Sequence, residues 1–246
     1  MKNVPHYERD ELLIAEIYEA LVTGTLPVFF AESSEGYLWG KGTLFMVQWG
    51  AHQFAVTAKH VIENQQANWK HLRILIPGYK VALPLSTAST PSYPNHECKD
   101  DVEDIFVFHI EKDPDLDGEH LVWYTWRMKE LWMPASKLEV GQQIFAVGYP
   151  FIDDRYDYDG NKVKTPPLIA IGKLSPDSIG ADIYTIECEE FDLDLNGISG
   201  GPVFARFSGI FHYVGIIIRA GQKARKIHFV DASYVTFIFN EIESKL

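Results

Sequence analysis

The sequence predicts a mainly β protein made of two packed barrels or sandwiches. From Leu26 onward, about a dozen short apolar or alternating segments follow one another, separated by Gly, Pro and Asp residues. Short strands in such numbers, with turn residues between them, are typical of closed or packed sheets. The chain has 246 residues, of which 46% are hydrophobic, and this is enough for one large domain or two small ones with a sizeable core.

One helix is expected before the first strand. Residues 8–22 place apolar side chains at the spacing of one helix face, opposite a charged face, and Thr23 and Gly24 follow as a stop signal. We interpret this helix as packed on the body of the protein, in an N-terminal extension that covers residues 1–25. Its apolar stripe consists of Leu13, Ile17, Ala20 and Leu21.

The expected strands fall into two groups, which define the domains 26–134 and 135–246. The first group lies at 27–31, 43–48, 53–57, 72–76, 79–83 and 105–110. The second group lies at 143–147, 168–173, 183–188, 202–205, 212–218 and 227–230. The segment 112–140 joins the two groups, and its tryptophans are expected to be core and interface anchors. A helix from Tyr234 to Lys245 is expected to end the second domain.

Charge and composition exclude several classes of function. The formal net charge is −12, from 34 acidic and 22 basic residues, and an acidic surface repels phosphate backbones, so nucleic acid is not expected as a partner. No apolar run suits a signal peptide or a membrane span. With Cys98 and Cys188 as the only cysteines, we expect reduced thiols in a cytoplasmic protein, and a single disulfide is the alternative.

Three local patterns place a histidine, an aspartate and a serine, in that order, beside expected strands. His60 ends a Thr-Ala-Lys-His run that follows an apolar strand, Asp104 stands directly before Ile-Phe-Val-Phe, and Ser199 lies in Gly-Ile-Ser-Gly-Gly-Pro. A serine in such a glycine-rich turn can expose its hydroxyl. The backbone N–H groups of Gly197 and Ser199 can then point at one oxygen atom and form an oxyanion hole.

These side chains suit nucleophilic catalysis. The Ser199 hydroxyl is unreactive until a base takes its proton, which is the role expected for His60. A carboxylate on the other ring nitrogen fixes the imidazole tautomer and stabilises the imidazolium, which is the role expected for Asp104. The neighbouring acids Asp100, Asp101 and Glu103 are alternatives, and the position directly before an apolar strand favours Asp104.

The motifs resemble those of the chymotrypsin-like serine peptidases, and among them the bacterial trypsin-like group that includes the high-temperature-requirement proteases. Further matches are Gly40 to Phe45, Val140 to Pro150 and Tyr213 to Gly221. The resemblance extends from Leu26 to Glu243 and implies two antiparallel six-stranded β-barrels with the site in the cleft between them. It also implies a serine endopeptidase that acts on protein or peptide substrates and needs no metal or organic cofactor.

The same resemblance places the substrate pocket. Leu193 would lie at its base, with Ile218, Arg219 and Ala220 along its wall. An apolar base gives no counter-charge to a buried Lys or Arg side chain, so small or medium apolar residues are expected on the acyl side of the cleaved bond. Acidic residues attracted by Arg219 are the alternative.

The sequence also departs from the family pattern. Ile198 stands where the digestive enzymes have Asp, and Ile218 replaces a serine that supports their catalytic aspartate. No segment long enough for a PDZ domain follows the protease unit, and the N-terminal helix is not part of the minimal fold. The alternative function is therefore a protease-fold module that binds peptides or proteins with little or no turnover.

Three further patterns are interpreted as structural. His96, Cys98 and Cys188 are potential zinc ligands, but their spacing matches no standard site. Acidic residues alternate in 153–160 without the terminal Glu of an EF-hand loop, so we expect a solvated loop. The basic cluster near the C-terminus is expected to be a solvated face; it consists of Arg219, Lys223, Arg225 and Lys226.

Overall fold

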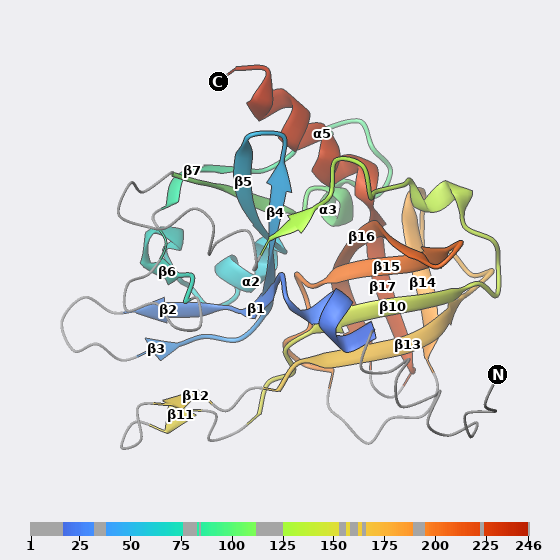
Figure 1. Cartoon of the computed structure of the whole chain (residues 1–246), viewed down its shortest axis with the longest axis horizontal. Helices are drawn as coiled ribbons and strands as arrows, with labels where there is room; N and C mark the ends of the chain where they lie inside the picture. Colours follow the sequence, from blue (N-terminus) through green and yellow to red (C-terminus); the bar gives the residue numbers. More distant parts are fainter. Residues whose placement is uncertain are drawn as a thin grey trace, which may run out of the picture.

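Two β-sheet units lie side by side in the computed structural model, and a C-terminal helix packs against them (Figure 1). The structure describes residues 17–31, 38–75, 83, 85–111, 125–152, 156–157, 162–163, 166–188, 195–221 and 224–245. The protein is mainly β, as the sequence predicts. No helix in the described part of the chain is long and apolar enough to cross a membrane.

The first unit contains two sheets that share one core. Its strands are β1 (Thr25–Pro27), β2 (Phe29–Ala31), β3 (Leu38–Trp39), β4 (Thr43–Trp49), β5 (His52–Thr57), β6 (Leu72–Arg73), β7 (Leu85–Ser89), β8 (Phe106–Ile110) and β9 (Trp126–Arg127). The larger sheet has the order β1-β4-β5-β8-β7, and β9 pairs with β4 in parallel; the smaller sheet has the order β3-β2-β6. Phe30, Met46 and Phe108 bring the two sheets together in one apolar cluster.

Closure of this first unit into a barrel, which the resemblance implies, is not shown. Among the described residues, β6 and β7 do not pair with each other, so the two sheets remain separate in the hydrogen-bond pattern. The strand expected at 79–83 falls mostly outside the described residues, and β7 begins later, at Leu85.

The second unit is a closed six-stranded antiparallel barrel, which confirms the expectation for this half. Its strands are β10 (Gln143–Gly148), β13 (Leu168–Leu174), β14 (Ile183–Cys188), β15 (Pro202–Phe207), β16 (Ile210–Gly221) and β17 (Lys226–Asp231), in the order β10-β13-β14-β17-β16-β15. Alternation along β10 sets its two faces, because Ile144 and Ala146 enter the barrel core while Phe145 and Val147 face the first unit. A small hairpin of β11 (Tyr156–Asp157) and β12 (Lys162–Val163) extends from this unit (Figure 1).

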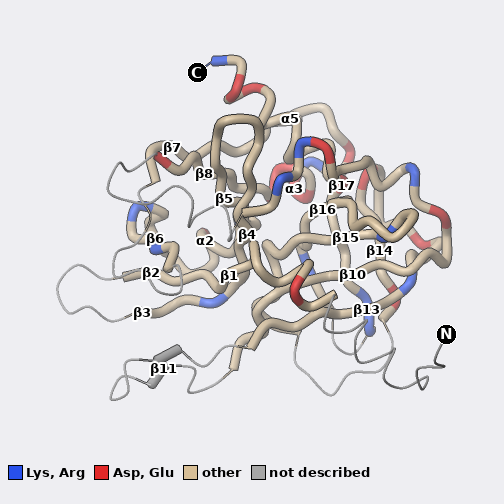
Figure 2. Tube along the Cα trace, in the orientation of Figure 1, with Lys and Arg blue, Asp and Glu red and all other residues tan. Residues whose placement is uncertain are grey.

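An apolar layer joins the two units. The rings of Phe45 on β4 and Tyr213 on β16 lie 5.5 Å apart, and Trp126 on β9 stacks on Phe204 on β15 at 4.4 Å. Trp132 is partly buried against the same layer. Charged residues lie mostly in loops and at the ends of elements (Figure 2). The sheets can therefore bury both of their faces without burying unpaired charges.

Helices lie at both ends of the described chain. Residues 17–22 are helical, with Ile17 and Leu21 buried, and they form the end of the helix expected at 8–22, whose first part lies outside the described residues. The expected C-terminal helix is α5 (Ala232–Glu243). Shorter helical segments are α2 (Lys59–Glu63), α3 (Lys99–Val102), η1 (Trp69–His71) and η2 (Ala135–Lys137).

Helix α5 follows the barrel in sequence but also packs on the first unit. The ring of Phe239 on this helix stacks on the ring of Phe54 on β5, with 4.8 Å between the ring centroids. The indole N–H of Trp49 on β4 donates a hydrogen bond to Asn240 at 3.1 Å. The helix therefore fixes the position of β4 and β5, the strands that lead to His60.

Candidate active site

His60 and Asp104 come together because two antiparallel strands place them there. β5 ends at Thr57, which pairs with Phe106 at the start of β8, so the residues after β5 lie beside the residues before β8. His60 Nδ1 lies 2.6 Å from Asp104 Oδ2, and the backbone N–H of His60 donates to Asp104 Oδ1 at 2.8 Å. Both oxygens of one carboxylate therefore hold the ring and the backbone of the same residue.

This double contact determines which ring nitrogen is available for chemistry. An ionised carboxylate only accepts hydrogen bonds, so Nδ1 carries the proton in the neutral ring and Nε2 carries the free electron pair. The Asp104 side chain is 15% exposed and the His60 side chain 32%, so the carboxylate is the more buried partner. The imidazole can then take a proton at Nε2 while Asp104 stabilises the resulting cation.

The neighbouring carboxylate Asp101 is directed elsewhere. It accepts a hydrogen bond from Arg219 Nη2, across the boundary between the two units. Of the acids that the sequence offers at this position, the structure brings Asp104 to the imidazole and pairs Asp101 with an arginine.

Ser199 lies in a turn that requires its glycines. Gly197 and Gly200 have φ angles of 95° and 86°, in the left-handed region that side chains disfavour. A Cβ atom on Gly200 would lie 2.2 Å from the carbonyl oxygen of Thr43, and one on Gly201 would lie 1.9 Å from that of Val147. Glycines at these positions therefore let the turn pack directly against both units.

The two N–H groups expected to form an oxyanion hole are free in the described part of the chain. Neither Gly197 N–H nor Ser199 N–H has a hydrogen-bond acceptor among those residues. Both residues line a cavity of about 190 Å³ that His60 also lines. An oxygen atom with developing negative charge could accept both hydrogen bonds there.

Thr43, the first residue of β4, holds the serine turn from the other unit. Its backbone N–H donates to the carbonyl of Ser199 at 3.0 Å, and its hydroxyl donates to the carbonyl of Gly197 at 2.9 Å. The same hydroxyl accepts the N–H of Tyr149 at 2.8 Å. Sequence reasoning missed this residue, although it lies in the Gly40 to Phe45 motif. Thr43 is fully buried, and its bond to Tyr149 is buried, whereas its bond to the Gly197 carbonyl is partly buried beside the cavity.

Ile198 anchors the same turn on the barrel side. It is 1% exposed and belongs to the barrel core. A Cβ atom on Gly148 would lie 2.7 Å from the Ile198 Cβ, so β10 and the turn are in close contact. The turn is therefore fixed by apolar packing on the barrel side.

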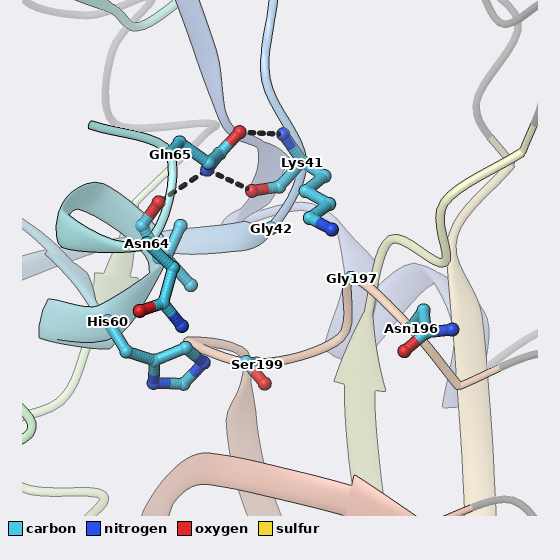
Figure 3. A pocket seen from close by; sticks show the side chains of 9 residues that line it. Lys41, Gly42, His60, Asn64, Gln65, Asn196, Gly197 and Ser199 are labelled. Atoms are coloured by element: carbon cyan, nitrogen blue, oxygen red, sulfur yellow. Dashed lines mark hydrogen bonds between the residues drawn. The ribbon is translucent and has the colours of Figure 1, made fainter. Parts of the chain in front are cut away.

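Ser199 and His60 face one cavity, but their side chains are not hydrogen-bonded to each other in the described structure (Figure 3). In Figure 3 the Ser199 hydroxyl points away from the imidazole. A serine hydroxyl moves from one staggered position to another by rotation about its Cα–Cβ bond. Exposed side chains make such rotations in picoseconds to nanoseconds. The lining residues are Lys41, Gly42, His60, Val61, Asn64, Gln65, Asn196, Gly197 and Ser199.

The residues expected to line the substrate pocket have different surroundings. Leu193 lies outside the described residues. Ile218 is 3% exposed, and its side chain belongs to the apolar layer between the units. Arg219 is half-exposed and paired with Asp101, so its charge is already partly neutralised. Ala220 is partly buried against the barrel core.

A histidine beside this wall was not singled out from the sequence. His228 on β17 lies opposite Arg219 on β16 and opposite Thr185 on β14, whose hydroxyl is 3.0 Å from Nδ1. Burial lowers the pKa of His228 below its usual value, and the positive charges of Arg219 and Lys226 lower it further. The charge of Asp101 opposes this shift only in part, so His228 holds a proton less readily than an ordinary histidine.

The potential zinc ligand His96 makes other contacts in the described structure. His96 accepts the Cys98 N–H at Nδ1 over 3.0 Å, and its Nε2 lies 2.9 Å from the Tyr234 hydroxyl. Within the described ranges, no group of three or more His, Cys, Asp or Glu residues could hold a metal ion. The acidic segment 153–160 falls largely outside those ranges. Cys98 and Cys188 are both free thiols.

Comparison with known proteins identifies no family for this chain. No model of a known protein family matches the chain, and no curated protein is similar to it. The fold defines a β-rich protein with a closed six-stranded antiparallel barrel, which is compatible with a trypsin-like fold.

Proposed function

We propose that the chain is a serine endopeptidase of the trypsin-like fold, with Ser199 as nucleophile, His60 as general base and Asp104 as the residue that orients it. This proposal rests mainly on the contacts of the Asp104 carboxylate with the ring and the backbone N–H of His60. His60 and Ser199 line the same cavity. Exposed ion pairs gain little energy, whereas the largely buried Asp104 carboxylate makes two hydrogen-bonding contacts with His60. The proposed role of Asp104 accounts for these two contacts with one residue.

The reaction follows from these positions. Ser199 Oγ attacks the peptide carbonyl carbon while His60 Nε2 takes its proton, and the carbonyl oxygen becomes an oxyanion near the N–H groups of Gly197 and Ser199. The C–N bond then breaks, and His60 gives the proton to the leaving amine. Water, deprotonated by His60, hydrolyses the resulting ester and restores the serine.

The two-barrel architecture is part of the same proposal. Leu83 N–H donates to the carbonyl of Ile74 at 3.2 Å, which supports a connection between the end of β6 and the start of β7. Such a connection would close the first unit around its single core. The expected cytoplasmic location also stays a proposal, supported by the two free thiols.

Labelling with a fluorophosphonate probe tests the proposal, because only an activated serine reacts with it. The full chain should be labelled, and Ser199→Ala and His60→Ala should not be. Mass spectrometry should find the adduct on Ser199. A folded chain without labelling would refute the proposal.

A second candidate is a protease-fold module that binds peptides with little or no turnover. The Ser199 hydroxyl, turned away from His60 in the described structure, favours it, as does the apolar Ile218 in place of a serine. This candidate predicts peptide binding without labelling, so the same experiment separates the two functions.

A further inference from the structure

The cavity beside Ser199 extends to one side of the nucleophile. Its described lining comes from the glycine-flanked segment before β4, from α2 and the residues after it, and from the serine turn. Ile218, Arg219 and Ala220, the wall expected on the other side, do not belong to this lining. The cavity is therefore on the side of His60.

This side has a defined role in the proposed reaction. His60 Nε2 must give its proton to the leaving amine, so the peptide segment that follows the cleaved bond has to pass next to His60. A cavity that begins at His60 and continues along α2 faces that leaving segment. Its contacts would therefore discriminate between the residues that follow the cleaved bond.

Lys41 is held in place at the far edge of this cavity. Gln65 clamps its backbone, because the side-chain Oε1 accepts the Lys41 N–H and Nε2 donates to the Lys41 carbonyl, each at 2.7 Å. Gly40 and Gly42 on either side have φ angles of 122° and 130°. A Cβ atom on Gly42 would lie 2.3 Å from Val61 Cγ1, so α2 packs directly on this segment.

The fixed backbone directs the Lys41 side chain into the cavity. Figure 3 shows its ammonium group between the segment before β4 and the turn at Gly197. Lys41 is exposed, and no carboxylate of the described residues pairs with it. The described lining contains no acidic residue, and its other polar side chains are amides, an imidazole and a hydroxyl.

We infer that this cavity binds an acidic side chain, Asp or Glu, in the first or second residue after the cleaved bond, with Lys41 as the specificity-determining cation. This inference rests on the proposed function. A cation in a partly enclosed cavity attracts a carboxylate and repels Lys or Arg. The preference is distinctive because the protein as a whole carries a net charge of −12 and would repel acidic peptides without such a local contact.

Matched peptides test the inference. Three fluorogenic peptides share one acyl half and carry Glu, Gln or Lys at the first two positions after the cleaved bond. We expect kcat/KM to fall from Glu to Gln to Lys, by about two- to fivefold per step, because Lys41 is exposed. Lys41→Met should abolish the preference for Glu, and Lys41→Glu should make Lys the preferred residue. Added salt should weaken the preference because the contact is partly exposed.

Lys137→Glu is the matched control, since it changes the net charge equally at an exposed residue of η2 outside the cavity. It should leave the order of the three peptides unchanged. An equal shift in both charge variants would overturn the role of Lys41, because a general field effect would then explain it.

A binding measurement separates this inference from the proposed function. The same peptides, labelled for fluorescence anisotropy, are titrated into Ser199→Ala and into Ser199→Ala with Lys41→Glu, where turnover plays no part. Tighter binding of the Glu peptide, reversed by Lys41→Glu, supports the inference even if probe labelling fails. Equal binding of all three peptides refutes it even if probe labelling succeeds.

Discussion

Replacing Thr43 by valine tests whether one unit fixes the serine turn of the other. Valine has nearly the same shape but no hydroxyl, so the Gly197 carbonyl and the Tyr149 N–H lose their shared partner. A buried polar group without a partner costs about 1–3 kcal/mol, and this penalty falls mainly on the Tyr149 N–H because the Gly197 carbonyl is only partly buried, so the free energy of unfolding should fall by about 1–3 kcal/mol. The Thr43 backbone bond to Ser199 remains in the variant.

Probe labelling should fall further than stability alone explains. If the Gly197 carbonyl rotates, the neighbouring N–H groups move away from the oxyanion position, and loss of one such donor costs about 10²–10³ in rate. The assay is the second-order rate of fluorophosphonate labelling, taken at a temperature where urea titration shows the variant to be folded. Thr43→Ser keeps the hydroxyl and is the control, with a rate near that of the parent chain. A folded Thr43→Val chain that is labelled at the parent rate would refute this reasoning.

Four more predictions follow from the site. Asp104→Asn should reduce kcat by about 10⁴, because an amide can hold the wrong tautomer of the imidazole; a crippling Asp101→Asn beside a silent Asp104→Asn would reverse the assignment. The intact chain, with an N-terminal tag in place, should be labelled at Ser199, because the apolar packing of Ile198 needs no buried ammonium; labelling only after a defined N-terminal cut would contradict this. A peptide-library profile should show apolar residues on the acyl side of the cleaved bond, and dominant Arg or Lys there would be contrary to the prediction. Finally, the lowered pKa of His228 means that the unfolded chain takes up its proton near pH 6.5 while the folded chain resists it, so stability is full above that pH and falls below it. Urea midpoints at pH 7.5 and pH 5 should differ less in His228→Gln than in the parent chain, and an equal difference would show that His228 is not the group responsible.

The barrel strands were predictable because they are buried and apolar. The expected segments 143–147 and 183–188 match β10 and β14 within a residue. No strand was expected at β7, since Leu85–Ser89 has one large apolar residue and is partly exposed along its length. It is a strand because it pairs with β8, and pairing of this kind leaves no pattern in the sequence.

The candidate site residues could be predicted only where their neighbours in sequence mark them. The glycines around Ser199 and the strand after Asp104 mark those residues within a few positions. The hydroxyl contact of Thr43 spans 154 residues in sequence, and the contact of Arg219 with Asp101 spans 118. Neither contact has a local signature, because both depend on how the two units dock.

The position of α5 has a consequence for biosynthesis. The first unit is translated first, yet Trp49 and Phe54 need α5 to cover them. Until α5 has left the ribosome, these aromatic side chains stay partly uncovered and the strands that lead to His60 lack their final support. If the chain is the proposed peptidase, it would acquire activity only after the barrel and α5 had been made, and the nascent chain would not cut itself during translation.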